Sequence, residues 1–213
     1  MAEKEPSSFR LIATLVVAGV VSGVLLVSSY LWTLPQIQRN KAAALQAAVF
    51  RLLPGTTKMV PYVVDNDALK VYQRQGDELP SSDAVFAGFN AEGKLVGYAI
   101  PADGPGFADT IRVLYGFDAD RRTIVGMEIL DSKETPGLGD KIIDDKEFHA
   151  SLKALKVEPS IVLQKRGVPQ APNEVDAISG ATISSDAIVK LLNKSTKRWL
   201  PLFAKPLVTS QKD

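Results

Sequence analysis

The chain has 213 residues, of which 46% are hydrophobic, so it can form one domain of ordinary size and a membrane anchor, but not two catalytic domains. Its 25 lysines and arginines balance 24 aspartates and glutamates, which argues against a nucleic-acid partner. The lack of cysteine excludes disulfides, thiol nucleophiles and iron–sulfur ligation. The single histidine, His149, is too little for a zinc cluster or a histidine-based triad, and we expect it on a helix surface.

An apolar segment near the N-terminus predicts one transmembrane helix. Leu11 to Trp32 contains no charged residue, and its 22 positions span roughly 33 Å at about 1.5 Å per residue, which matches a hydrocarbon core of about 30 Å. A secretory signal peptide is the alternative, but its apolar stretch is normally only about 7 to 15 residues long. Lysines and arginines flank both ends, so charge does not decide the orientation. We expect a short segment at 1–10 and a membrane helix at 11–33.

The pattern after the anchor predicts a stalk helix and then an α+β domain. The stalk, residues 34–55, has helical spacing and ends at Pro54 and Gly55. Strands joined by short turns, with no helix between them, indicate a mainly antiparallel sheet. We expect the domain to span 56–204, with flanking helices, and a flexible tail at 205–213. The expected strands are 58–64, 70–74, 84–90, 94–101, 110–118, 122–130 and 161–164, and the expected helices are 144–155 and one after residue 182.

The segment Asp176 to Thr182, DAISGAT, is the most informative part of the chain. Gly180 and Ala181 leave little side-chain bulk beside Thr182, so a ligand could approach the backbone closely. Apolar residues at helical spacing follow, which puts Thr182 at the start of a helix, where free N–H groups and the helix dipole favour a phosphate. Judged by residue types alone, a capped helix start is the alternative interpretation.

A second segment, ETPGLGDK from Glu134 to Lys141, predicts a turn-forming loop after a strand. Pro136 fixes one dihedral angle, and the two glycines permit positive φ. Ile142 stands where a dinucleotide-binding fingerprint needs a third glycine, so that fingerprint is not met. By itself the segment is an ordinary surface connection. The loop at Gly104 to Phe107 could likewise be a wide turn between strands or a cover for a cofactor.

Together the two segments resemble the FMN-binding domain of the G subunit of the Rnf electron transport complex and, more distantly, the C subunit of the sodium-translocating NADH:quinone reductase. DAISGAT resembles the sequence on which a flavin transferase esterifies the phosphate of FMN to the last threonine, here Thr182. The resemblance implies covalent FMN on Thr182 and recognition of Asp176 by the transferase. It implies cofactor-binding roles for Ser179, Gly180, Ala181, Glu134, Thr135, Gly137, Leu138 and Gly139.

The resemblance also implies a function and a location. We expect a single-pass subunit in the cytoplasmic (inner) membrane, with its domain on the extracytoplasmic side, that relays electrons between ferredoxin and NAD within an ion-translocating complex. Its partners would be the other subunits, the transferase and the membrane, and it would have no metal site and no catalytic residues of its own. The alternatives are a C-type subunit of a sodium-translocating quinone reductase, a stand-alone anchored flavin reductase, and a non-redox binding module.

Overall fold

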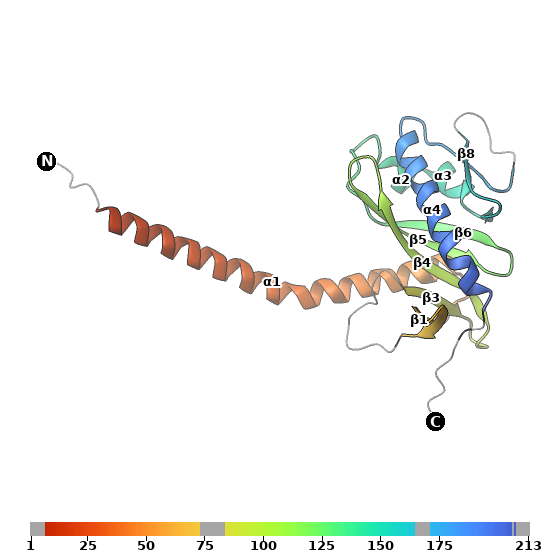
Figure 1. The fold of residues 1–213 in the computed structure, drawn as a ribbon, viewed down its shortest axis with the longest axis horizontal. Coiled ribbons are helices and arrows are strands. Elements are labelled where there is room, and N and C mark those ends of the chain that lie inside the picture. The colour runs from red at the N-terminus through yellow and green to blue at the C-terminus, as the bar shows by residue number, and fades with distance from the viewer. Residues whose placement is uncertain (1–6, 73–83, 165–170, 206, 208–213) are drawn as a thin grey trace, which may run out of the picture. The chain divides into compact units, whose positions relative to one another are not determined.

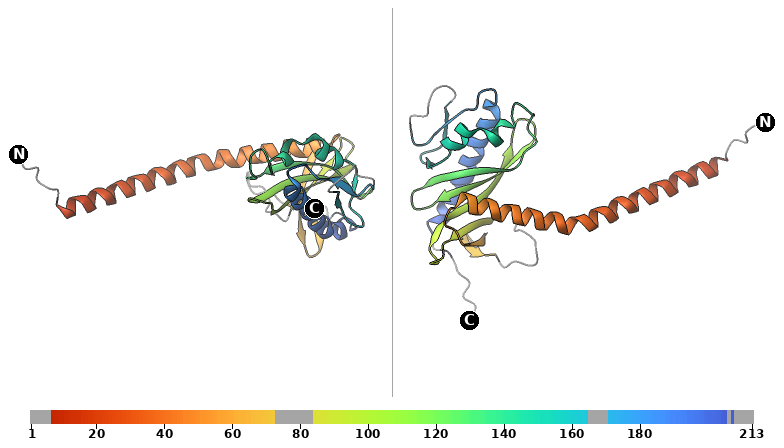
Figure 2. Two further views of the ribbon diagram at one scale, coloured as in Figure 1. Left: turned by 90° about the horizontal axis from the view of Figure 1, so that it is seen from above. Right: turned by 180° about the vertical axis from the view of Figure 1, so that it is seen from behind.

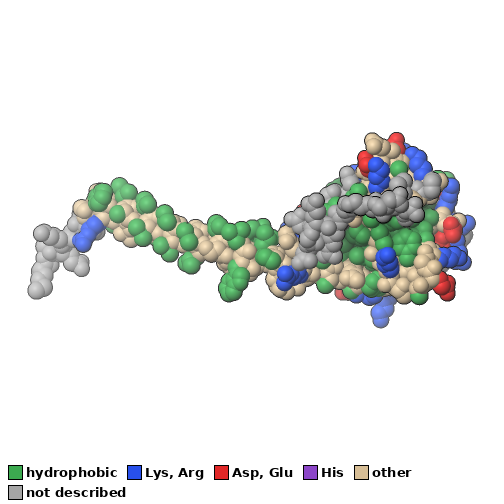
Figure 3. Space-filling view, turned by 90° about the horizontal axis from the view of Figure 1, so that it is seen from below, with side chains coloured by type: hydrophobic (Ala, Val, Ile, Leu, Met, Phe, Trp, Pro, Cys, Tyr) green, Lys and Arg blue, Asp and Glu red, His purple; other side chains and the backbone are tan. Residues whose placement is uncertain are grey.

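The computed structural model describes residues 7–72, 84–164, 171–205 and 207, and it divides into two compact units, Met1–Ala43 and Ala44–Asp213. Helix α1 (Ser8–Leu52) makes up most of the first unit and continues into the second (Figure 1). The expected membrane and stalk segments are therefore one continuous helix, with Pro35 inside it. Within the described residues, α1 is the one helix long and apolar enough to cross a membrane. Figure 3 shows hydrophobic side chains along it.

The second unit is an α+β domain built on a seven-stranded sheet, which confirms the predicted fold class. Every strand pair in this sheet is antiparallel, and the order is β2-β1-β3-β4-β5-β6-β7. Two further strands form a small parallel sheet. The strands are β1 (Lys58–Asp65), β2 (Ala68–Val71), β3 (Ala84–Phe89), β4 (Leu95–Pro105), β5 (Thr110–Asp118), β6 (Thr123–Asp131), β7 (Leu155–Lys156), β8 (Val162–Gln164) and β9 (Glu174–Asp176).

The prediction of one helix at 144–155 is wrong in its extent. Two short helices, α2 (Lys141–Asp144) and α3 (Lys146–Ser151), stand there, because Asp145 adopts an extended conformation and its side chain caps α3 by accepting a 2.8 Å bond from the Phe148 amide. His149 lies on α3 as expected, but it is half-buried, with a ring nitrogen 2.8 Å from the Ile142 carbonyl oxygen. The predicted residues 73–74, the turn at 76–83, the loop residues 167–170 and most of the tail lie outside the described residues.

The sheet carries a hydrophobic core on each face, because apolar side chains alternate along its strands. Val85 and Ala87 of β3 belong to the core beneath helix α4 (Thr182–Phe203), whereas Phe86 between them belongs to the core beneath the end of α1. Strand β5 alternates in the same way. Figures 1 and 2 show α4 lying along one face of the sheet. Helix α4 therefore covers this face of the sheet, and Ala181 and Ile188 near its start belong to the same core.

The opposite face receives the end of α1 through a row of glycines. At four glycines on successive strands, an added side chain would come into close contact with Leu52 or Leu53. At two of these positions the added Cβ would lie only 3.0 Å from the nearest Leu53 carbon. Side chains at these positions would separate the helix from the sheet. The last two turns of α1 are thus part of the folded domain. The glycines are Gly88 of β3, Gly97 of β4, Gly116 of β5 and Gly126 of β6.

Candidate functional site

Thr182 is the first residue of α4, and its side chain is half-buried. Its hydroxyl forms no hydrogen bond with any described residue. The first intrahelical bond of α4 runs from the Ser185 amide to the Ala181 carbonyl, at 2.9 Å, so the amides of the preceding three residues have no partner within the helix. A free hydroxyl therefore stands beside free N–H groups, which is an arrangement suited to a phosphate.

The neighbouring hydroxyls are already engaged. Ser185 is fully buried; its Oγ accepts a bond from the Ile178 amide at 3.1 Å and donates to the Ala181 carbonyl at 3.0 Å. Ser184 is buried and donates to Glu134 at 2.5 Å. Ser179 is exposed, but it lies in the loop before the helix. Among the hydroxyls of the first turn, only that of Thr182 is accessible and unbonded.

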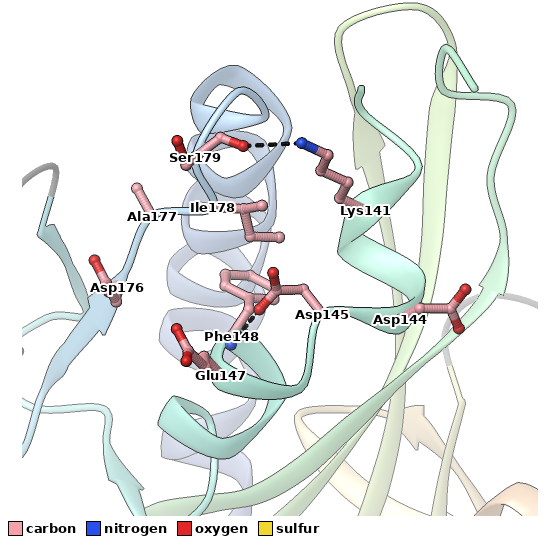
Figure 4. Close-up of a pocket in the computed structure, with 9 residues that line it drawn as sticks. All are labelled: Lys141, Asp144, Asp145, Glu147, Phe148, Asp176, Ala177, Ile178 and Ser179. Atoms are coloured by element: carbon pink, nitrogen blue, oxygen red, sulfur yellow. Dashed lines mark hydrogen bonds between the residues drawn. The ribbon is translucent and has the colours of Figure 1, made fainter. Parts of the chain in front are cut away.

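Lys141 places a cation beside this loop. Its Nζ donates to the Ser179 carbonyl at 3.2 Å, and a Cβ on Gly180 would lie 3.4 Å from the same nitrogen. Gly180 has φ +81°, a conformation that glycine adopts without strain. Figure 4 shows Lys141 reaching from α2 to the loop. Lys141 was part of the second sequence motif, but the sequence carried no signal for this contact.

An open groove of about 510 Å³ runs beside the same loop. One wall is the segment from Asp176 to Ser179, and the other comes from α2 and α3 (Figure 4). Asp176 lies at the end of β9 and is half-buried. Asp145 and Phe148 lie across from it on the other wall. The groove is therefore lined by acidic side chains and runs from Asp176 along the loop that precedes Thr182.

Glu134 is a buried carboxylate that joins three segments. Only 5% of the residue is exposed. One carboxylate oxygen accepts bonds from the Phe107 and Ala108 amides, both at 2.9 Å, and the other accepts the Ser184 hydroxyl. Burial by itself would raise the pKa of Glu134, but the Ser184 hydroxyl and the backbone amides outweigh it, and the pKa is lowered. Glu134 is therefore ionised at neutral pH.

The lowered pKa of Glu134 predicts an acid-dependent loss of stability. A carboxylate with a lower pKa in the folded state contributes stability that is complete above its unfolded pKa, about 4.3, and is lost as the pH falls through the folded value. Thermal unfolding of the wild type and Glu134→Gln, from about pH 7 to about pH 3, should show the difference between them changing only in this acid range. Parallel pH profiles of the two proteins would contradict this assignment.

The segments joined by Glu134 carry three exposed apolar side chains. Phe107, whose amide bonds Glu134, is 64% exposed. Leu138, in the loop that follows Glu134, is 53% exposed, and Ile183, next to Ser184, is 61% exposed. Loop 135–138 is exposed, whereas Glu134 and Gly139 at its two sides are buried. Gly137 has φ +74°, as the turn predicted. The structure thus supplies apolar contacts that are open to a planar ligand.

The structure brings the two predicted segments together at the start of α4. Ser179, Gly180 and Ala181 form the turn that leads into Thr182, and Ala181 is its buried N-cap residue. The Thr135 carbonyl accepts the Leu138 and Asp140 amides, at 3.1 and 3.4 Å, and closes the other loop. Sequence reasoning missed the Ser184 bond to Glu134. No cluster of three potential metal-ligating His, Cys, Asp or Glu side chains occurs in the part of the chain that the structure describes.

Comparison with known proteins identifies the domain. A family model for the FMN-binding domain matches residues 106–197, which include both segments. The G subunit of an ion-translocating oxidoreductase complex from Methanosarcina acetivorans is 31% identical over 189 residues, covering 87% of this chain and 91% of that protein. The G subunit of a Na(+)-translocating ferredoxin:NAD(+) oxidoreductase complex from Acetobacterium woodii is 36% identical over 132 residues, covering 61% of each.

Solved structures share the fold. NqrC from Shewanella oneidensis superposes with a TM-score of 0.64 at 20% identity, covering 78% of this chain and 98% of that one. The C subunit of the Na(+)-translocating NADH-quinone reductase from Parabacteroides distasonis gives 0.63 at 21% identity, covering 80% and 96%. These matches confirm the resemblance that the sequence motifs indicated.

Proposed function

The chain belongs to the family of G subunits of ion-translocating oxidoreductase complexes, and we propose that it relays electrons through FMN held as a phosphoester on Thr182. The observation that carries this proposal is the free, half-buried hydroxyl of Thr182 at the start of α4, directly after the loop to which Lys141 donates a hydrogen bond. Exposed apolar side chains lie on the segments that Glu134 joins to this helix. The residues present fit a flavin nucleotide: a hydroxyl to esterify, a cation and free amides for phosphate, and apolar surface for a ring system.

Each residue of the site has a part in holding the group. In the phosphoester, the Thr182 hydroxyl would have given up its proton and the phosphorus one of its oxygen substituents, so that the chain would carry FMN less one water. The Lys141 ammonium and the first amides of α4 compensate the remaining phosphate charge. Phe107, Leu138 and Ile183 offer apolar contacts that exclude water. Bound FMN supplies the one- and two-electron redox chemistry, and the protein supplies binding, orientation and electrostatics.

The wider setting is part of the proposal. The named relatives act in ion-translocating complexes, one of them between ferredoxin and NAD, and we extend that role and the partner subunits to this chain. A flavin transferase would recognise Asp176, which lines the groove leading to the acceptor loop. The described part of the chain contains no metal-ligating cluster of its own, so electrons would reach and leave it through partners. Helix α1 would anchor the domain at the cytoplasmic membrane.

The direct test is the state of the chain purified from its own membranes. We expect flavin fluorescence on the denatured band after gel electrophoresis and an intact mass raised by FMN less one water. A chain of unmodified mass from active membranes would rule out the covalent relay and favour a non-redox module. Partner subunits that copurify in mild detergent would separate the proposed complex from a stand-alone flavin reductase.

Lys141 should assist loading of the flavin. Lys141→Met removes the cation that bonds the loop before Thr182, and the rate of covalent attachment by a flavin transferase should fall by about tenfold, because the charge proposed to compensate the phosphate is lost. In-gel fluorescence measured against time gives the rate. Lys146→Met is the matched control, since Lys146 is at the start of α3 and does not line the groove. Equal rates for the two variants would remove Lys141 from the phosphate site.

The domain should face away from the cytoplasm. Because the chain has no cysteine, single cysteines can report its orientation to a membrane-impermeant maleimide. Lys153→Cys, at an exposed position of the domain, should be labelled on intact spheroplasts, whereas Ser8→Cys, at the start of α1, should be labelled only after lysis. The reverse pattern would place the domain in the cytoplasm.

A further inference from the structure

The carboxylate of Glu134 lies where three parts of the chain meet. It bonds the Phe107 and Ala108 amides, 27 and 26 positions earlier, and the Ser184 hydroxyl, 50 positions later. With both oxygens taken by protein donors and 5% of the residue exposed, the carboxylate has little capacity left for a ligand. Its role is therefore in how these segments are held.

The surrounding backbone is shaped to this carboxylate. A Cβ added at Gly106 would overlap one carboxylate oxygen and lie 2.7 Å from the Asp109 carbonyl. A Cβ at Gly139 would overlap the other oxygen and lie 2.8 Å from Ser184 Oγ. Side chains at these two positions would have to displace Glu134. Glycine on both sides thus lets two loops close around one carboxylate.

Each segment that Glu134 joins presents one component of the site. The first contains Phe107, whose side chain is exposed; the second is the loop with Leu138; and the third is the first turn of α4, where Thr182 precedes Ser184 by two positions. Helix α4 has no acidic residue in its first turn and no side-chain cap, so the bond from the Ser184 hydroxyl to Glu134 ties down a helix start that has no cap of its own.

We propose that Glu134 is a positioning residue for the flavin site: its carboxylate fixes the Phe107 segment and the Leu138 loop against the acceptor helix and does not itself contact the flavin. This inference rests on the proposed function. Glutamine can keep the geometry, since its carbonyl can accept both amides and its amide nitrogen can donate to Ser184 Oγ. Alanine cannot. We call Glu134 and its bonds to Phe107, Ala108 and Ser184 the clamp. The clamp predicts that Glu134→Gln keeps the arrangement of the site and that Glu134→Ala loses it.

The test compares the full-length wild type with Glu134→Ala, Glu134→Gln and Glu128→Ala in mild detergent. Glu128→Ala is the matched control, because Glu128 also bonds a distant residue, Arg51, but on β6 away from the acceptor. In Glu134→Ala, flavin attachment by a transferase should slow by about tenfold or more, and the Phe107 and Ala108 amides should exchange hydrogen at least about tenfold faster. The other two variants should stay near the wild type in both measurements.

Four outcomes count against the inference. If Glu134→Ala attaches flavin and exchanges its amide hydrogens at wild-type rates, no clamp is needed. If Glu134→Gln attaches flavin as slowly as Glu134→Ala, the carboxylate acts through its charge and not through its geometry. If the wild type itself takes up no flavin, the proposed function fails with this inference, and the wild-type lane reveals that case. Should Glu134→Ala not fold, Ser184→Ala removes one of the three bonds with less disturbance; slower loading supports the clamp, and unchanged loading counts against it.

Discussion

Replacing Thr182 with alanine should leave the chain with no covalently bound flavin. The substitution removes the acceptor oxygen, and the other hydroxyls of the first turn, on Ser184 and Ser185, are buried and bonded within the protein. The fold should persist, because Thr182 is half-buried, makes no hydrogen bond among the described residues, and alanine favours a helix; the expected change in the free energy of unfolding is about 0.5 kcal/mol. Gel fluorescence and intact mass measure the loss.

Two controls sharpen this result. Thr182→Ser keeps a hydroxyl at the same position and should retain at least part of the labelling. Ser160→Ala removes an exposed hydroxyl that lies outside both motifs and should remain fully labelled. Flavin that persists on Thr182→Ala would move the attachment site away from Thr182.

A chain that begins at residue 54 should not fold, whereas one that begins at residue 44 should fold as an independent domain. The shorter chain lacks the buried side chains of Leu45, Val49, Leu52 and Leu53, which form the core on the glycine-lined face of the sheet. At about 1.5 to 3 kcal/mol for each buried side chain, the loss is roughly 8 kcal/mol, and a domain has only about 5 to 15 kcal/mol of stability. Circular dichroism during thermal and urea unfolding measures the difference.

Single substitutions separate the contribution of these side chains from that of chain length. Leu53→Ala removes a side chain that is 2% exposed and should cost about 2 to 5 kcal/mol. Leu31→Ala, at an exposed position in the other unit, should leave the stability of the domain unchanged. A folded, cooperative chain starting at residue 54, or equal effects of the two leucine substitutions, would show that the end of α1 is dispensable.

The start of α4 could be predicted from the sequence, but the long-range contacts of the site could not. The segment from Asp176 to Thr182 predicted a helix start, and α4 begins at Thr182. Local chemistry sufficed for that, since helix starts follow from nearby residues and periodicity. The partners of Glu134 could not be predicted, because its bonds reach 27 and 50 positions along the chain. The contact of Lys141 could not be predicted either, because its ammonium group donates to a carbonyl 38 positions away.

By itself, the sequence determined the long apolar segment, the antiparallel strands and the two motifs of the FMN-binding domain, because each depends on residues that are close together along the chain. Only the tertiary structure decided that the end of α1 belongs to the domain core, that Asp145 divides the expected helix, and which hydroxyl remains free. Burial and hydrogen bonding depend on which distant segments the chain path brings into contact, and no local pattern of residues encodes that path.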